Sequence, residues 1–260
     1  MTVFKHELRQ GWKSLLVWTA SIGFLMAVCI FLFPEMKGEM EGVSHIFASM
    51  GGFTAAFGMD RLNFGEFHGF YAVECGNILG LGGAFFAALI AVAALCKEEK
   101  EHTAEFLLAH PVTRTGIVTA KLLSVLAELL ILNGAILLLT VLSVLAIGES
   151  PDWHKILLLH LANGLLQLEI AAVCFGVSAF LKRSGLGIGL GLAALLYCLN
   201  IVDNLTEKAE WLKYVTPFGY ADGAQIMTDG LDAGMLAAGM AYAALGIAAA
   251  YIWYLRKDIS

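Results

Sequence analysis

Residues 97–121, with the sequence KEEKEHTAEFLLAHPVTRTGIVTAK, form the only strongly charged segment that lies between two long apolar runs. The segment opens with five charged residues and continues as a short helical pattern with Ala104, Leu107 and Leu108 on one side. Thr103 is placed to cap this helix, because a threonine hydroxyl accepts a hydrogen bond from a free amide at a helix start. Pro111 cannot continue the helix, so we expect a turn before the next apolar run. The pattern predicts a cytoplasmic segment between two membrane-spanning helices.

The composition of the whole chain supports a membrane location. Hydrophobic residues make up 59% of the 260 residues and charged residues only 15%, which excludes an ordinary soluble domain. No long polar region is present, so we expect one membrane domain over residues 1–260, and nucleic acid is not an expected partner. The five cysteines form no CxxC pair and lie mostly in apolar runs. They are therefore interpreted as packing residues, not as disulfide partners or metal ligands.

Six apolar runs are long enough to cross a bilayer, since about 20 helical residues at about 1.5 Å each span the hydrocarbon core. The predicted fold is all-α, a polytopic membrane protein with six transmembrane helices. The predicted spans are residues 15–33, 78–96, 117–147, 156–181, 186–202 and 235–255.

The distribution of basic residues predicts the orientation. With both termini in the cytoplasm, the inner segments hold eleven of the sixteen lysine and arginine residues. Basic residues are enriched in the cytoplasmic segments of membrane proteins. We therefore expect a multi-pass protein of a bacterial cell membrane with both chain ends inside.

The N-terminal residues 2–13 carry an amphipathic pattern. Phe4, Leu8 and Trp12 share one helical stripe, and lysine and arginine side chains form the neighbouring stripe. This pattern is typical of an interfacial helix whose rings lie among lipid headgroups and whose cations face anionic lipid. The alternative is that these residues are the first turns of the first spanning helix.

Two acidic segments are expected on the outer side, at residues 34–76 and 203–232. The first has two apolar clusters at helical spacing, which predict two short helices on the outer membrane surface before the second span. The clusters are Ile46, Met50, Phe53 and Phe57, and then Phe64, Phe67, Phe70 and Tyr71. The second segment contains the turn sequence TPFGY at residues 216–220, just before the last span.

The charged segment resembles the loop between the second and third membrane helices of the ABC transporter type-2 permeases. The residues that carry this resemblance are Glu101, Thr103, Glu105, Leu107, Leu108, Pro111, Arg114 and Lys121. His102 departs from the family pattern, which has glycine before the threonine. The proline-aromatic turn before the last span is also similar to these permeases, in which short external helices precede span six.

The resemblance implies a partner and a mechanism. In such permeases this segment is a cytoplasmic coupling helix that docks on a separate ATPase subunit, which binds ATP and Mg²⁺. Leu107 and Leu108 would be its apolar anchors, and Glu101, Glu105 and Arg114 its polar contacts. The resemblance also implies a second permease subunit, identical or homologous, contact with membrane lipid, and export of a peptide, antibiotic, lipid or similar amphiphile.

Several catalytic motifs are absent from the sequence. It contains no GxxxxGK[ST] phosphate loop, no HExxH metal motif and no GxSxG nucleophile elbow, so we expect no enzyme activity and no cofactor in this chain. Glu98 and Glu99 resemble the paired glutamates of one class of intramembrane protease, but Thr103 stands where that class has arginine. The alternative function is a six-span immunity or scaffold protein, or a membrane enzyme, without a transport role.

Two acidic residues, Glu128 and Glu169, lie inside predicted spans. An ionised carboxylate is costly in hydrocarbon, so each should face protein or water. One interpretation places them along a polar translocation route or at a subunit interface, and the other makes them protonated residues that hold helices together. The amides at comparable depth, which are potential hydrogen-bond partners, are Asn133, Asn163, Gln167 and Asn200. His160 is interpreted as a packing histidine, because no second ligand lies at metal spacing.

Overall fold

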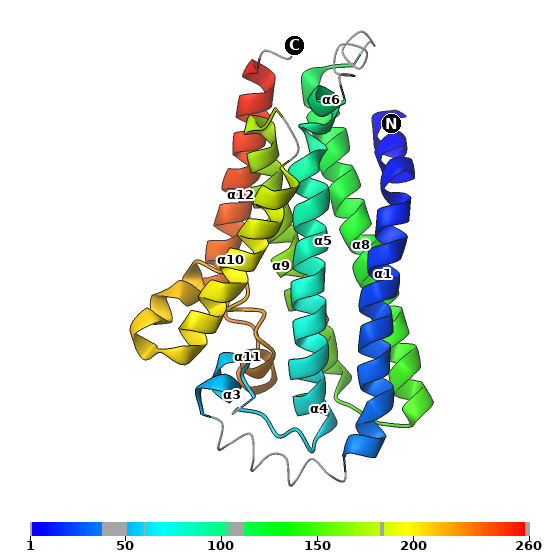
Figure 1. Cartoon of the computed structure of the whole chain (residues 1–260), viewed down its shortest axis with the longest axis vertical. Coiled ribbons are helices and arrows are strands. Elements are labelled where there is room, and N and C mark those ends of the chain that lie inside the picture. The colour runs from blue at the N-terminus through cyan, green and yellow to red at the C-terminus, as the bar shows by residue number, and fades with distance from the viewer. Residues whose placement is uncertain are drawn as a thin grey trace.

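The computed structural model describes residues 2–37, 51–59, 61–101, 103, 112–182 and 185–257, and over these residues it contains helices and loops but no strand (Figure 1). Six of its helical segments are long and apolar enough to cross a membrane, which confirms the all-α fold with six spans. Their bounds are α1 Thr2–Met36, the joined segment Phe67–Ala94, α8 Arg114–Ile147, α9 Trp153–Phe180, α10 Leu186–Leu205 and α12 Ala233–Arg256.

Short helices lie between the long ones. At one end of the bundle α6, Lys97–Lys100, follows the second span, and Figure 1 places both chain ends at this same end. We call it the α6 end. The opposite end, which we call the α11 end, carries α3 Gly52–Ala56 and α11 Gly223–Thr228, and the 3-10 helix η2 Glu207–Tyr214 follows α10 and packs against it.

Helices α5 and α9 form the centre of the bundle. More than half of each apolar segment is buried, 56% for Phe67–Ala94 and 61% for Trp153–Phe180, whereas the other four spans reach at most 28%. Helix α9 packs against both α5 and α12, α1 packs along α8, and α10 packs on α5. Much of the surface of the four outer helices is therefore not covered by other parts of the chain.

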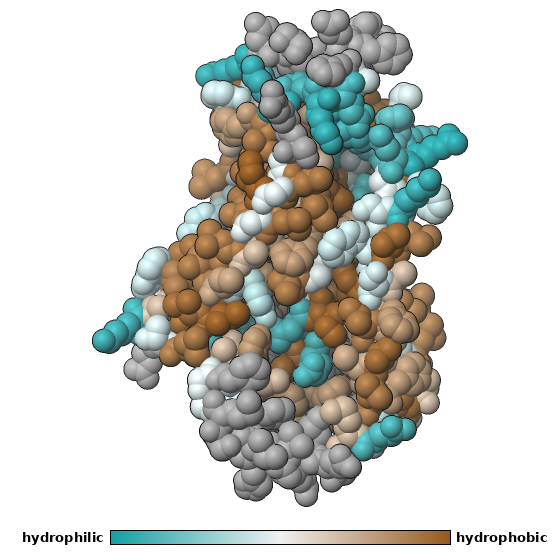
Figure 2. Space-filling view, in the orientation of Figure 1, coloured by the Kyte–Doolittle hydropathy of each residue, from teal (hydrophilic) through white to brown (hydrophobic). Residues whose placement is uncertain are grey.

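Large apolar side chains cover these outward surfaces. Phe24 is 66% exposed on α1, Leu130 is 70% exposed on α8 and Leu245 is 66% exposed on α12. Figure 2 shows hydrophobic residues over most of the visible face and hydrophilic residues gathered at the α6 end. Exposure of this kind is unfavourable in water but is expected of helices that face lipid.

The second span begins earlier than the sequence indicated. Helix α4, Phe67–Phe70, the π-helix η1, Tyr71–Cys75, and α5, Gly76–Ala94, continue one another without a break. Three residues of the aromatic cluster that we expected in a second external helix, Phe67, Phe70 and Tyr71, therefore belong to the start of this helix, and Phe64 lies just before it. It is buried because Phe67 and Phe70 pack on Phe33 of α1, with ring centroids 5.2 and 5.3 Å apart.

The first external cluster falls mostly outside the described residues. Ile46 and Met50 lie in the undescribed stretch 38–50, and α3 follows directly as a short helix before the second span. At the N-terminus, residues 2–13 are continuous with the first span in α1 and do not form a separate helix.

Glycines allow α9 and α12 to approach closely. A Cβ atom placed on Gly176 would lie 2.6 Å from the carbonyl oxygen of Gly246, and one on Gly246 would lie 2.5 Å from the carbonyl oxygen of Ala172. Neither position has room for a side chain unless the backbones separate. Small residues at helix contacts are the usual means of close packing in membranes.

Replacement of Gly246 by leucine is expected to separate α9 from α12 and to lower the free energy of unfolding by about 1–3 kcal/mol, as overpacking of a tight contact does. Thermal unfolding in detergent measures the effect. Gly134→Leu is the matched control, because a Cβ at Gly134 has nothing within 4 Å. Equal stability of the two variants would contradict the close α9–α12 contact.

Candidate functional site

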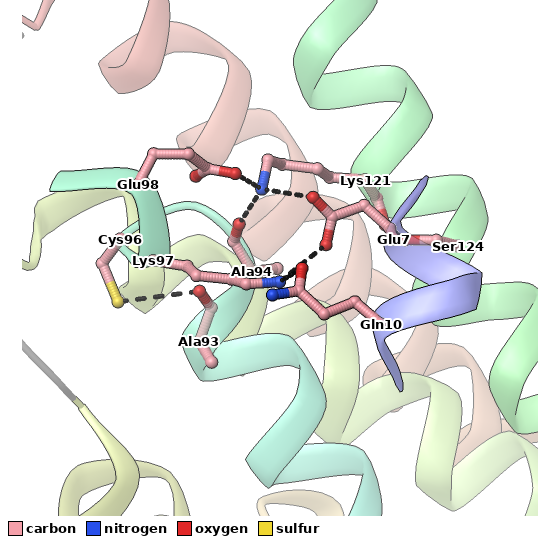
Figure 3. Close-up of polar contacts among 9 residues, drawn as sticks. All are labelled: Glu7, Gln10, Ala93, Ala94, Cys96, Lys97, Glu98, Lys121 and Ser124. Atoms are coloured by element: carbon pink, nitrogen blue, oxygen red, sulfur yellow. Dashed lines mark hydrogen bonds and ion pairs between the residues drawn. The ribbon is translucent and has the colours of Figure 1, made fainter. Parts of the chain in front are cut away.

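A buried lysine gathers three helical segments at the α6 end. The side chain of Lys121, on α8, has no exposed surface, and its Nζ atom lies 3.1 Å from Glu7 Oε1 and 2.5 Å from Glu98 Oε1. The same ammonium group donates a hydrogen bond of 2.7 Å to the carbonyl oxygen of Ala94. Figure 3 shows how these groups converge from α1, α5, α6 and α8.

A second lysine extends the network. Lys97 Nζ lies 3.3 Å from Glu7 Oε2 and also donates to the side-chain oxygen of Gln10 (Figure 3). Glu7 thus bridges two lysines. Residues Glu7, Gln10, Lys97, Glu98 and Lys121 are called the charge cluster below.

A separate ion pair joins α6 to the end of α12. Lys257 Nζ lies 2.7 Å from Glu99 Oε1 and donates a hydrogen bond of 2.8 Å to the carbonyl oxygen of Leu181. The side chains of Glu99 and Lys257 are only 8% and 7% exposed. Glu98 and Glu99 each have a lysine partner, so both residues anchor α6 to neighbouring helices.

A buried ion pair contributes little net stability while it is intact, but each charge needs its partner to remain buried. Removing one partner leaves an uncompensated charge, which costs roughly 3–5 kcal/mol, although the intact pair adds little stability over an apolar contact. The charge cluster and the Glu99–Lys257 pair therefore fix the position of α6 relative to α1, α8 and α12. A displacement of α6 must either carry these helices along or break buried pairs.

The predicted coupling residues fall into three groups. Glu101 and Thr103 are exposed at the α6 end. Arg114 begins α8, and its Nη1 atom donates hydrogen bonds of 2.6 Å to the carbonyl oxygen of Lys257 and 3.3 Å to that of Leu255. Outside the described residues lie Glu105, Leu107, Leu108 and Pro111, and with them the helix that Thr103 was expected to cap.

Arg114 thus has a partner within the chain. Its guanidinium satisfies carbonyl groups at the end of α12, where cations also interact favourably with the helix dipole. Next to it, the hydroxyl of Thr113 accepts a hydrogen bond of 3.1 Å from the amide of Gly116 and so caps α8. The chain therefore enters the third span from a fixed point on the last one.

The amide side chains inside the spans were expected to be potential hydrogen-bond partners of Glu128 and Glu169, but the hydrogen bonds found for them have other partners. Asn133 donates a hydrogen bond of 2.7 Å to the side-chain oxygen of Gln167, and Asn163 bonds to its own helix at the carbonyl oxygen of Leu159. Neither Glu128 nor Glu169 takes part in these hydrogen bonds. The amides act instead as local contacts of α9 with α8 and α5.

Glu169 lies 3.0 Å from the hydroxyl of Tyr220, which donates to its Oε2 atom, and both residues are buried. Glu128 packs where α1 has Gly11: a Cβ on that glycine would lie within 3 Å of the carboxyl group. The Oε2 atom of Glu128 has no hydrogen-bond partner among the described residues. The two acids therefore occupy different helix contacts and do not meet within one chain.

His160 is a packing residue, as its surroundings in the sequence indicated. Its Nε2 atom lies 2.7 Å from the hydroxyl of Tyr71, which lies 3.4 Å from the hydroxyl of Thr140. These side chains link α9, the start of the second span and α8 in the buried interior. All five cysteines are free.

Glu7 is the member of the charge cluster that the sequence pattern did not indicate. The aromatic and basic stripes of residues 2–13 predict contacts with lipid and do not include this acid. Lys121, however, is a charge inside a predicted span, which requires a nearby acid. A search for acids near the ends of the other spans would have identified both Glu7 and Glu98 as candidates.

Replacement of Lys121 by methionine keeps the length of the side chain but leaves Glu7 and Glu98 without their shared cation. We expect a loss of roughly 3–5 kcal/mol in the free energy of unfolding. Lys100→Met, in the same segment but exposed, is the control and should unfold like the wild type. The triple variant with Glu7→Gln and Glu98→Gln should recover part of the loss, and equal stability of Lys121→Met and Lys100→Met would show that the cluster does not hold the helices.

Replacement of Glu169 by glutamine preserves an acceptor for the buried hydroxyl of Tyr220, so the stability should change by less than about 1 kcal/mol. Glu169→Leu removes the acceptor, and the unsatisfied hydroxyl should cost about 1–3 kcal/mol. Thermal unfolding of both variants in the same detergent makes the comparison. If glutamine destabilises as much as leucine, the carboxyl group is ionised and the protonated interpretation is wrong.

Comparison with known proteins agrees with this architecture. The family model described as ABC-2 family transporter protein matches residues 1–259, which is nearly the whole chain. No curated protein matches the chain at a significant level. The match covers all six spans, the α6 end with its charge cluster and the external helices, so it is not a local similarity of apolar segments. The chain therefore belongs to the ABC-2 transporter family and is a membrane permease subunit of an ABC transporter.

Proposed function

We propose that the chain is the permease of an ATP-driven exporter and that residues 97–116 couple it to a separate ATPase subunit. The ATPase would bind ATP and Mg²⁺ at the cytoplasmic face of a bacterial cell membrane, with the α6 end and both chain ends on that side. Two permeases, identical or homologous, would assemble with two ATPase subunits. The cargo would be a peptide, an antibiotic, a lipid or a similar amphiphile.

The observation that carries this proposal is the anchoring of α6. This short helix leads into the coupling segment, and its Glu98 and Glu99 pair with lysines of α8 and the end of α12. Through Glu7 the same network includes α1. A force applied to the coupling segment by a moving ATPase therefore reaches three spanning helices through buried ion pairs.

The arrangement also indicates how the helices would respond. Interior packing does not deform continuously, so anchored helices move as rigid bodies. Helix α9 packs on α5 and α12, and it would be the fixed centre about which the anchored helices rearrange. ATP binding would draw the coupling segments together, and the spans would shift with them.

The contacts with the ATPase would come from the exposed part of the segment. Glu101 is exposed, whereas Arg114 is already bonded to the end of α12. We therefore assign the polar contacts to Glu101 and Glu105 and the apolar anchors to Leu107 and Leu108. Arg114 would act from within the permease, by holding α8 against α12.

Affinity purification of the tagged chain from its native membrane in mild detergent is expected to recover an ATPase subunit. Alanine at both Leu107 and Leu108 should remove it, because the apolar anchors of a docking helix supply most of its binding energy. Alanine at both Leu138 and Leu142, which are exposed on α8 away from the α6 end, is the matched control and should retain it.

Two results would count against the proposal. Recovery of no ATPase with the folded wild-type chain would favour the immunity or scaffold function. Retention of the ATPase by the Leu107 and Leu108 variant would place the docking site elsewhere.

A further inference from the structure

Helices α9, α10 and α12 form a groove within the membrane part of the bundle. Helix α10 packs on α5 and η2, whereas α12 packs on α9, so α10 and α12 are not packed closely on each other. The groove between them has a volume of about 460 Å³. Volumes of this size accommodate small organic ligands.

The floor of the groove is the close contact between α9 and α12. Gly176 and Gly246 line it, and because neither has a side chain, they leave a hollow there. Leu192 and Leu196 of α10 form the opposite wall. Leu245 of α12 lies at the rim and is exposed. Since the exposed surface of these helices is the one that faces lipid, the groove opens toward the bilayer.

The groove has a direction, with one polar and one apolar end. On α9, Glu169 lies at one end and Phe180 at the other, three helical turns apart, which is about 16 Å along the axis. Helix α12 runs in the same direction, because Gly239 lies beside Glu169 and Gly246 beside Gly176. An elongated molecule in the groove would therefore have one end at Glu169.

The turn at residues 216–220 closes the Glu169 end. The hydroxyl of Thr216 donates a hydrogen bond of 2.9 Å to the carbonyl oxygen of Leu196, and the hydroxyl of Tyr220 donates one of 3.0 Å to Glu169 Oε2. Val215, directly before the turn, lines the groove. A ligand therefore ends at Glu169 and does not continue toward the α11 end.

The carboxyl group of Glu169 has one oxygen that the protein does not satisfy. The residue is only 5% exposed, and its Oε2 atom lies against Gly239 and accepts from Tyr220. Its Oε1 atom has no hydrogen-bond partner among the described residues and, unlike Oε2 of Glu128, it is not fully buried. Because Glu169 lines the groove, this oxygen is available to a ligand there.

A hydroxyl group is the ligand group that matches Oε1. It both donates and accepts hydrogen bonds, so it pairs with the carboxyl group in either protonation state. An ammonium head would bring three N–H groups to a groove in which Tyr242 is the only other polar lining side chain among the described residues. A phosphate or carboxylate head would face another acid, and a plain hydrocarbon chain would leave Oε1 unsatisfied.

We propose that this groove binds a long-chain alcohol from the surrounding bilayer, with its hydroxyl on Glu169 Oε1 and its hydrocarbon chain along Leu196 and Leu192 toward Phe180. Lipid tails are as apolar as these side chains, so hydrocarbon contact alone gives little preference. The hydrogen bond to Glu169 selects the alcohol over a phospholipid tail. The assignment of this ligand as transported cargo rests on the proposed export function, whereas its binding does not.

The test is photolabelling of the purified chain in phosphatidylcholine nanodiscs with 1-dodecanol that carries a diazirine at the far end of its chain. We expect saturable labelling near Phe180 and Leu192, located by mass spectrometry of the peptides. Unlabelled 1-dodecanol should compete. Dodecane should compete about tenfold more weakly, as expected for the loss of one hydrogen bond in an apolar site.

Variants of Glu169 test the polar end. Glu169→Leu removes the hydrogen bond and should weaken competition by 1-dodecanol about tenfold. Glu169→Gln should retain binding, because its amide group keeps an acceptor for Tyr220 and supplies a donor and an acceptor to the groove.

Variants of α10 test the apolar part and leave the bond between Glu169 and Tyr220 in place. Leu192→Trp fills the groove and should abolish saturable labelling. Leu195→Trp is the matched control, because Leu195 is exposed on the same helix but does not line the groove, and it should label like the wild type. Thermal unfolding of each variant verifies that it is folded.

Several results would overturn the proposal. They are no saturable labelling, equal competition by dodecane and 1-dodecanol, or an equal effect of Leu192→Trp and Leu195→Trp. Stronger competition by dodecylammonium, with Glu169→Gln as damaging as Glu169→Leu, would show that the ligand is a cation. Labelling that disappears when two chains share a nanodisc would show that a second copy covers the groove.

The outcome is independent of the exporter proposal, because these measurements need no ATPase. If the chain recovers its ATPase partner but binds no alcohol, the ligand assignment is wrong and the exporter function stands. If it binds the alcohol but recovers no ATPase, the reverse holds.

Discussion

The ammonium group of Lys121 sets the constraint on which the α6 end of the bundle depends. It is fully buried at the start of a long membrane helix, where a charge without partners is unfavourable. Its partners Glu7 and Glu98 come from the first span and from α6, so their shared cation requires these elements to lie together. Lys97 and the Glu99–Lys257 pair extend the same requirement to the last span.

This constraint relates stability to function. A permease driven by a separate motor needs a part that the motor can move and a rigid connection from that part to the spans. Packing alone is weak for a helix as short as α6, which has only four residues. Buried ion pairs give it defined positions, because partial displacement exposes unpaired charges.

Much of the fold followed from the sequence. Runs of apolar residues identify the six spans, because a bilayer requires about 20 apolar residues in a helix whatever its neighbours are. The segment 97–121 indicated the family, which the match over residues 1–259 confirms. The helix that contains the second span begins at Phe67, earlier than the pattern indicated, because Phe67, Phe70 and Tyr71 have the spacing of a surface helix but pack on Phe33 and His160.

The sequence alone determined the fold class, the number of spans and the family, since these depend on composition and on local patterns. Only the tertiary structure decided which charges pair. Glu7 and Lys121 are 114 residues apart, and Glu169 and Tyr220 are 51 apart. It also decided that Asn133 bonds to Gln167 and that the Oδ1 atoms of Asn200 and Asp203 are buried without a hydrogen-bond partner in the described part of the chain. The physical reason is that hydrogen bonds and ion pairs act over about 3 Å, so they depend on how helices pack, which a one-dimensional pattern does not specify.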